Sequence, residues 1–415
     1  MRAALHRGLA RKPPYLFRVL TLLVAGTLLL HFVHLSSASS PAPSRVPAHQ
    51  LFEALARAVV AAGAELVLLQ GSTGGVALST GAYPDGRPER HTVADQASAA
   101  VLRRVALGFP GLAVVNEEEV AAGGGGAGQG WAATREGDAG GAAAGVGAAA
   151  SLAAGSAQRS PTLPLPELAV FVDPLDATQE YSEGLWEYVT VSACLTRCGV
   201  PIAGLIYQPF QQRLYWTRPG TAVNVAFSAD GAVEAERALP HTWEEEGQAE
   251  GQCCRQRRQQ QQSWSALDAN ATAGLRLVMS RSHSQKGSTA AILASLPPDA
   301  TAIPAGGAGY KFIQVLEGSA DAYLHPGGSR KWDVCAGEAL LLAAGGSVSQ
   351  WGGGATDYCL PPLPPAQLGG QAARQQAMDS AVRIAGLVAA KSGQLGQALV
   401  GLLGGSSGVP AAQVQ

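Results

Sequence analysis

The segment Val172-Asp173-Pro174-Leu175-Asp176-Ala177-Thr178 joins an apolar run to a turn that carries two carboxylates. The run, residues 168–172, predicts a short strand, and Pro174 stiffens the turn that follows it. Carboxylates on a loop at a strand end make a hard, oxygen-rich site that suits Mg²⁺. The alternative interpretation is an ordinary turn whose side chains cap the backbone.

Two more acidic groups lie at the ends of apolar elements. Residues 112–115 predict a strand that runs directly into Glu117-Glu118-Glu119. Asp333 stands before the apolar stretch 334–342 and is predicted to be the N-cap of a helix, which alone would stabilise that helix by ~1 kcal/mol. Only 14% of the residues are charged. Because acidic residues are scarce, their position at the ends of elements favours one shared metal site.

Three segments together resemble a known family. They are Val114-Val115-Asn116-Glu117-Glu118, then 172–178, then Trp332-Asp333-Val334-Cys335-Ala336-Gly337. In this order they resemble the lithium-sensitive, Mg²⁺-dependent phosphatase superfamily that includes inositol monophosphatase. The resemblance covers about residues 54–403 and implies an α+β fold, the layered αβαβα sandwich of the inositol monophosphatase and fructose bisphosphatase type. The alternation of predicted strands and helices independently indicates a layered α/β or α+β architecture.

The resemblance also implies roles for single residues. Two or three Mg²⁺ ions would be held by Glu117, Asp173, the carbonyl of Leu175, Asp176 and Asp333. The third glutamate leaves the register open, and a gap-free count from Phe109-Pro110 favours Glu117 as the ligand and Glu118 as its neighbour.

A base and its helper are implied in the same way. Asp95 and Thr178 would orient and deprotonate the attacking water. Without the resemblance, Asp95 is a first-turn charge of the helix predicted over residues 93–107, and Thr178 is a turn residue.

Within the superfamily, the likeness is greatest to the 3′-phosphoadenosine 5′-phosphate phosphatases, in particular their membrane-anchored Golgi form. It rests on residues 176–181, where most relatives have glycine at the position of Ala177, on Ser280-Arg281-Ser282-His283-Ser284, and on residues 303–311. Residues 203–209 also resemble the soluble bisphosphate nucleotidases. The implied contacts to substrate come from Thr178, Ser280, His283, Gly307 and Lys311.

The glycine-rich turn 306–309 has a physical interpretation of its own. Glycine lets backbone N–H groups approach an anion, and the start of a helix favours negative charge. The turn, with Lys311 on the helix after it, is therefore predicted to hold the second phosphate of a nucleotide. The simpler alternatives are a structural turn and, for His283, an ordinary surface position.

These features predict hydrolysis of the 3′-phosphate of 3′-phosphoadenosine 5′-phosphate to AMP and phosphate. An inositol-phosphate phosphatase with the same metals is one alternative, and an inactive membrane-tethered binding protein is another. Every ligand position expected from the family holds a competent residue, which argues against the inactive protein. The chain has 29 Lys and Arg and 31 Asp and Glu, so no net field favours a nucleic acid polymer as partner. A homodimer is left open.

The N-terminus carries the membrane prediction. Residues 19–35 are mostly apolar, and these 17 residues match the short end of the ~17–25 that span a bilayer. The basic residues before them favour a cytoplasmic N-terminus and a lumenal catalytic part in the Golgi. A cleaved signal followed by a secreted lumenal protein, and a transit peptide to an organelle such as the chloroplast, are the alternatives.

The predicted organisation follows from these segments. It comprises a cytoplasmic tail (1–18), a transmembrane signal-anchor (19–35), a stem (36–47), a phosphatase domain (48–404) and a short tail (405–415). Insertions are predicted at about 121–166, 230–272 and 352–380, where composition is biased or the family pattern is interrupted. The six cysteines show no paired CxxC spacing, so a zinc site is not expected, and their disulfide state cannot be inferred from sequence.

Deletion of residues 123–157 should leave the fold and activity largely intact. This stretch of Gly and Ala lacks the apolar side chains that would offset the entropy of ordering it. The thermal unfolding temperature and kcat/KM of the deletion variant measure the effect, and a large loss of activity would show that the segment takes part in function.

Overall fold

The computed structural model describes residues 45–70, 77–82, 88–121, 161–218, 223–227, 274–281, 288–360 and 366–405. The predicted signal-anchor, most of the first two predicted insertions and His283 lie outside these ranges. Among the described helices, none is long and apolar enough to cross a membrane.

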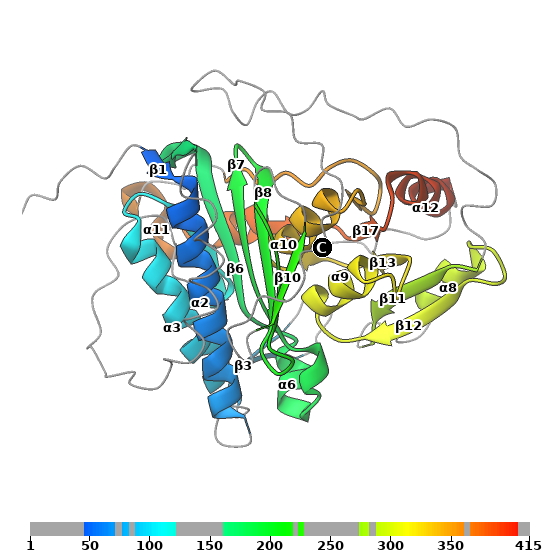
Figure 1. Ribbon diagram of the computed structural model, residues 1–415, viewed down its shortest axis with the longest axis horizontal. Coiled ribbons are helices and arrows are strands. Elements are labelled where there is room, and N and C mark those ends of the chain that lie inside the picture. Colours follow the sequence, from blue (N-terminus) through cyan, green and yellow to red (C-terminus); the bar gives the residue numbers. More distant parts are fainter. Residues whose placement is uncertain are drawn as a thin grey trace, which may run out of the picture. The chain divides into compact units, whose positions relative to one another are not determined.

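A six-stranded sheet forms the first half of the fold (Figure 1). Its order is β10 (Asn224–Phe227), β9 (Arg213–Thr217), β8 (Val200–Gln208), β7 (Thr190–Arg197), β6 (Leu168–Asp176) and β4 (Ala113–Asn116). All neighbours are antiparallel except β4 and β6, which run parallel. Short turns at Cys198-Gly199 and at residues 209–212 connect β7 to β8 and β8 to β9 as hairpins.

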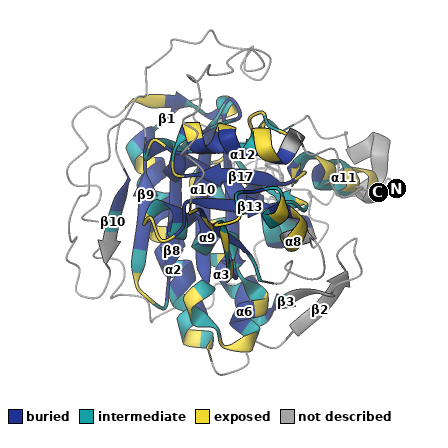
Figure 2. Ribbon diagram, turned by 90° about the vertical axis from the view of Figure 1, so that its right-hand side faces the viewer, coloured by how far each residue is buried: buried dark blue, intermediate teal, exposed yellow. Residues whose placement is uncertain are grey.

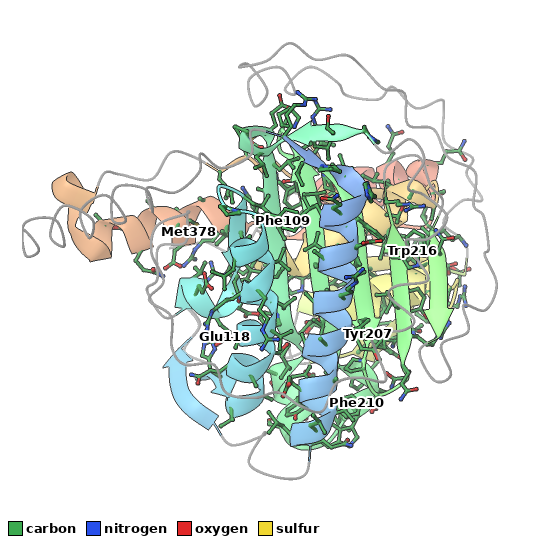
Figure 3. All side chains as sticks on the ribbon, turned by 60° about the vertical axis from the view of Figure 1, so that its left-hand side comes forward. Phe109, Glu118, Tyr207, Phe210, Trp216 and Met378 are labelled. Atoms are coloured by element: carbon green, nitrogen blue, oxygen red, sulfur yellow. A yellow bond between two sulfur atoms is a disulfide. The ribbon has the colours of Figure 1, made fainter. Side chains whose placement is uncertain are left out.

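Helices cover both faces of this sheet. On one face lie α2 (Ala48–Leu69) and α3 (Val93–Gly108), and on the other lies α10 (Lys331–Ala343). In α2, the residues Leu51, Leu55, Val59 and Leu66 recur at helical spacing, form an apolar stripe and are fully buried. Figure 3 shows Tyr207 of β8 and Trp216 of β9 beside α2. Burial of such a stripe, at about 25 cal/mol per Å² of apolar surface, fixes α2 on the sheet.

A five-stranded sheet forms the second half. Its order is β12 (Thr301–Ala305), β11 (Arg276–Ser280), β13 (Ala322–His325), β17 (Leu387–Ala390) and β15 (Ser347–Gln350). On one face it packs against α10 and α9 (Ala308–Leu316), and α8 (Ser288–Ala294) and α12 (Gly393–Gly405) lie on its other side. The order of layers is therefore helix, sheet, helix, sheet, helix, as Figure 1 shows, and Figure 2 shows that strands β8, β13 and β17 of the two sheets are largely buried. This agrees with the layered sandwich that the sequence predicts.

Shorter elements complete the described chain. Three small ladders pair β1 (Arg45–Pro47) with β5 (Thr162–Pro164), β2 (Ala77–Ala82) with β3 (Pro88–Thr92), and β14 (Ser329–Arg330) with β16 (Arg383–Ile384). The remaining helices are α4 (Glu117–Ala121), α6 (Thr178–Glu183) and α11 (Ala366–Val382), with 3₁₀ turns at Leu165–Glu167 and Trp186–Tyr188. Thus β1 lies within the predicted stem, β5 within the first predicted insertion, and most of α11 within the third.

One predicted boundary is wrong in a way that matters for the site. Asp333 is not the N-cap of α10, because the helix begins at Lys331 and Arg330 is the N-cap. Asp333 is the third helical residue, and its carboxylate accepts the backbone N–H of Arg330 at 2.8 Å. Asp95 has the same position in α3, where it and Thr92 form a capping box. Capping boxes of this kind satisfy N–H groups that the helix leaves unpaired.

A disulfide joins the middle layers. Cys194 of β7 and Cys335 of α10 are bonded, and both are fully buried. Cys198 and Cys359 are disulfide-bonded as well, and no described cysteine is free. The first bond attaches the helix that carries Asp333 to the sheet that carries the other acidic residues.

Gly204→Ala should destabilise the fold by ~1–3 kcal/mol, the usual cost of overpacking. A Cβ at Gly204 would lie 2.5 Å from the carbonyl oxygen of Ala336, so α10 would have to move off β8. Gly401→Ala is the control, because a Cβ there meets open space and alanine favours a helix by up to about 1 kcal/mol. Urea unfolding measures both, and a Gly204→Ala protein as stable as the control would contradict this packing.

Candidate active site

The parallel pair β4 and β6 brings the first two carboxylates together. Asn116 pairs with Val172, so Glu117 and Asp173 follow at adjacent positions on the same edge of the sheet. Their carboxylates lie close enough for the charge of Asp173 to raise the pKa of Glu117. Burial, and then the charges of neighbouring carboxylates, raise the pKa of both side chains well above their ordinary values.

A bulge in β6 places Leu175 and Asp176 close to Glu117 and Asp173. Across from β7, the register shifts between Asp173 and Asp176, which leaves Pro174 and Leu175 without direct partners in the ladder. The Asp173 carboxylate accepts the N–H of Leu175 at 3.1 Å. The Pro174 carbonyl accepts the hydroxyl of Ser98 at 2.6 Å, which ties the bulge to α3.

Asp176 lies against the start of α9. Its carboxylate accepts the backbone N–H groups of Ala308 at 3.0 Å and Gly309 at 2.6 Å, and the hydroxyl of Thr190 at 3.0 Å. These N–H groups belong to the glycine-rich turn that the sequence predicts as a phosphate cradle. In the structure they hold a carboxylate of the chain itself.

Asp333 supplies the fourth carboxylate from the first turn of α10. It accepts hydrogen bonds from the Ser329 hydroxyl at 2.8 Å and from the Arg330 N–H. Burial raises the pKa of Asp333 to about 6, although its hydrogen bond from Arg330 opposes the shift. Asp333 also raises the pKa of Glu117 and Asp173 by repulsion, so the four carboxylates form one electrostatic group.

Negative charge prevails in this group. Among the described residues, the nearby cations are Lys311, whose pKa burial lowers to about 8, and Arg330. No three His, Cys, Asp or Glu side chains of the described chain converge closely enough to hold an ion as they stand. The carboxylates are hard oxygen donors that repel each other at short range, and this fits a divalent cation in donor type and charge.

Asp95 and Thr178 make direct contact beside the carboxylates. The Thr178 hydroxyl lies 3.0 Å from an Asp95 oxygen and 3.0 Å from the Leu175 carbonyl oxygen, and it can donate to one of them at a time. The other Asp95 oxygen accepts from the N–H and hydroxyl of Thr92, each at 2.5 Å. Burial, and next the charge of Glu118, raise the pKa of Asp95 to about 6.

Glu117 and Glu118 point to different neighbours. Glu118 lies 3.1 Å from the His91 ring, where α4 follows β4 (Figure 3). Its backbone N–H is accepted by the side chain of Asn116. Glu117, by contrast, lies beside Asp173, and the charges of Asp173 and Asp333 raise its pKa. This arrangement favours Glu117 as the residue that faces the carboxylate group.

The predicted substrate residues are only partly brought together. Gly307 has φ +57°, and its carbonyl accepts the buried Lys311 ammonium, which also lies 5.3 Å above the Tyr323 ring. Ser280 ends β11, whose neighbour β12 leads into the turn 306–309. Arg281, next to Ser280, pairs with Glu180 and Glu183 of α6.

Comparison with known proteins identifies the family of the chain. The profile of the inositol monophosphatase family matches residues 52–389. The chain belongs to the inositol monophosphatase family. The fold is shared with the extragenic suppressor protein suhB of Bartonella henselae, at a TM-score of 0.51 and 16% identity over 86% of this chain and 99% of that one.

Curated relatives cover a shorter part of the chain. Over 202 residues, the sequence is 31% identical to inositol monophosphatase 3 of Danio rerio, covering 47% of this chain and 48% of the relative. It is 32% identical to the Golgi-resident adenosine 3′,5′-bisphosphate 3′-phosphatase of Homo sapiens, covering 47% and 45%. The chain therefore spans about half the length of the curated relatives that it matches.

Sequence reasoning missed three hydroxyl side chains that donate hydrogen bonds to the acidic residues or to the bulge between them. Thr92, Ser98 and Thr190 each donate to the site, and all three are fully buried. The Thr92-x-x-Asp95 spacing of a capping box was available as a signal. The other two partners depend on contacts between distant elements, which spacing along the chain does not reveal.

The metal-free protein should lose stability as pH rises from about 4 to 6. The pKa values of Asp95 and Asp333 rise from 3.8 to about 6 on folding, so in this window the folded state binds more protons than the unfolded state. The free energy of unfolding therefore falls with pH. Mg²⁺ added at pH 7.5 should increase the free energy of unfolding again, because the ion offsets the repulsion between the carboxylates.

Glu117→Gln tests the same repulsion. With EDTA at pH 7.5 it should raise the unfolding temperature, and it should respond less to Mg²⁺ than the unaltered protein does. Glu53→Gln is the matched control, since Glu53 pairs with Arg57 on the surface of α2. Differential scanning fluorimetry measures both, and equal Mg²⁺ responses of the two variants would contradict the assignment.

Proposed function

We propose that the chain is a Mg²⁺-dependent phosphatase that converts 3′-phosphoadenosine 5′-phosphate to AMP and phosphate. The observation that carries the hydrolase assignment is the contact of Thr178 with Asp95 and the Leu175 carbonyl, next to four mutually repelling carboxylates. This combination offers a base, a hydroxyl relay and a place for divalent cations. Membership of the inositol monophosphatase family supports the same reaction class.

The metal ligands would be Glu117, Asp173, the Leu175 carbonyl, Asp176 and Asp333. All five come from the edge where β4 and β6 end and from the start of α10. Bound Mg²⁺ would polarise the phosphoryl group, activate water and stabilise the leaving oxygen. The hydrogen bonds from Ala308, Gly309, Thr190, Ser329 and Arg330 would fix the ligand oxygens beforehand.

Asp95 would act as the general base through Thr178. When the Thr178 hydroxyl donates to Asp95, its lone pairs are free to accept a hydrogen bond from water and so orient it. As the water oxygen bonds to phosphorus, its proton would pass to the Thr178 oxygen while the Thr178 proton passes to Asp95. The bond from phosphorus to the ribose 3′-oxygen breaks, and that oxygen takes a proton from solvent water. Two donors from Thr92 hold Asp95 in the orientation that this relay needs.

The nucleotide assignment has less structural support than the chemistry. It rests on Ser280, on Gly307 and Lys311 of the adjoining turn and helix, and on the name of the human relative. The N–H groups of Ala308 and Gly309 in the same turn already bind Asp176. Arg281 joins this region to α6, the helix that Thr178 begins. Inositol phosphate hydrolysis is the second candidate, which the name of the zebrafish relative favours.

The Golgi lumen is the proposed compartment, with attachment through residues 19–35. The bonded state of every described cysteine supports an oxidising compartment, because disulfides persist in the secretory pathway. The name of the human relative points the same way. A glycan on Asn270-Ala271-Thr272, which lies outside the described residues, would confirm a lumenal position.

Asp95→Asn should lower kcat on every substrate by about 10²–10⁴, the usual contribution of a general base, and leave Mg²⁺ binding intact. The unaltered protein should show a higher kcat/KM for 3′-phosphoadenosine 5′-phosphate than for inositol 1-phosphate. Steady-state assays with phosphate release as the readout measure both. A preference for inositol 1-phosphate would favour the second candidate, and a fully active Asp95→Asn protein would contradict the base assignment.

A further inference from the structure

Thr190 stands directly opposite Asp176 in the first sheet. The two are register partners of β7 and β6, on the far side of the bulge at Pro174. The Thr190 side chain is fully buried, and its hydroxyl donates to Oδ2 of Asp176 at 3.0 Å. A buried hydroxyl must find such a partner, because an unpaired one costs free energy. The sheet register thus determines which side chain meets this aspartate.

The donors around Asp176 are distributed unequally between its two oxygens. Oδ2 accepts from Gly309 N at 2.6 Å and from Thr190 Oγ1, whereas Oδ1 accepts only the N–H of Ala308 at 3.0 Å among the described contacts. An ionised carboxylate has about two acceptor sites on each oxygen. Oδ2 is therefore saturated by the protein, and Oδ1 keeps one site.

The turn before α9 is shaped to make these contacts. A Cβ at Gly309 would lie 2.3 Å from Thr190 Oγ1, and one at Gly307 would lie 2.8 Å from the Tyr188 carbonyl oxygen. Gly307 also has a positive φ of 57°, which disfavours other residues. The glycines therefore let the start of α9 close onto β7 around Asp176. The contact with the Asp176 carboxylate therefore explains why Gly307 and Gly309 occupy this turn.

We infer that Thr190 is a positioning residue for the metal site, and that it directs Oδ1 of Asp176 toward the cation. By saturating Oδ2, the Thr190 hydroxyl and Gly309 N–H prevent rotation of the carboxylate and leave a single oxygen for the ion. The inference rests on the proposed metal-dependent function. It concerns the geometry of one ligand and is independent of which phosphate ester is hydrolysed.

Direct metal binding tests this inference without a substrate. Thr190→Val keeps the shape of the side chain and removes its hydroxyl, and Thr190→Ser keeps the hydroxyl. Thr196→Val is the matched control, because Thr196 is a buried threonine of the same strand whose hydroxyl goes to the Ala169 carbonyl. Mn²⁺ binding is followed in the full protein by calorimetry and by the free-ion electron paramagnetic resonance signal, and unfolding temperature in EDTA reports on folding.

Thr190→Val should raise the Kd for Mn²⁺ by about 10–100-fold, as loss of a hydrogen bond to a metal ligand does. Thr190→Ser and Thr196→Val should bind Mn²⁺ as the unaltered protein does. With excess Mg²⁺, the kcat of Thr190→Val should recover while its substrate KM stays unchanged.

Three results would overturn the inference. They are unaltered Mn²⁺ binding by Thr190→Val, equal losses in Thr190→Val and Thr190→Ser, and an equal loss in Thr196→Val. If the unaltered protein binds Mn²⁺ but does not hydrolyse 3′-phosphoadenosine 5′-phosphate, the proposed substrate fails while the binding comparison still decides the role of Thr190.

Discussion

Repulsion among buried carboxylates is the constraint on which the site depends. Burial raises the pKa of Glu117, Asp173 and Asp333 because the charged form loses its solvation, and the charges of neighbouring carboxylates raise each of these pKa values further. Folding such a group without a cation costs free energy, and the rest of the fold must supply it. In the proposed function, a divalent cation would remove most of that cost, so the repulsion that destabilises the metal-free protein would also favour binding of the ion.

Three local structural features of the layered fold bring these charges together. Parallel pairing of β4 and β6 places Glu117 beside Asp173, a bulge turns Leu175 and Asp176 inward, and the first turn of α10 presents Asp333. The Cys194–Cys335 disulfide ties α10 to β7. Each feature is rigid, since it belongs to an element buried in a core between layers. Rigid elements are what ligand positions need, because small displacements weaken a metal site.

Much of this could be predicted from the sequence, for physical reasons. The apolar runs 168–172 and 112–115 predict the strands β6 and β4, and the family resemblance of the acidic motifs implies the layered fold. The sequence did not indicate that the turn 306–309 would meet Asp176, because that contact joins residues 132 and 133 positions apart. Likewise, the sequence predicts Asp333 as an N-cap, because the first helical residues, Lys331 and Trp332, carry no signal for a helix start. The partners of each carboxylate became visible only from the tertiary contacts.

The central claim is that the carboxylate group of Glu117, Asp173, Asp176 and Asp333 holds divalent cations. A crystal structure of the protein soaked in Mn²⁺, with anomalous difference maps at the manganese edge, tests it most directly. If these four carboxylates bind the ion, the map should show anomalous peaks coordinated by them, with Oδ1 of Asp176 among the ligands. Full-occupancy peaks elsewhere, or none at this edge of the sheet at saturating Mn²⁺, would contradict it.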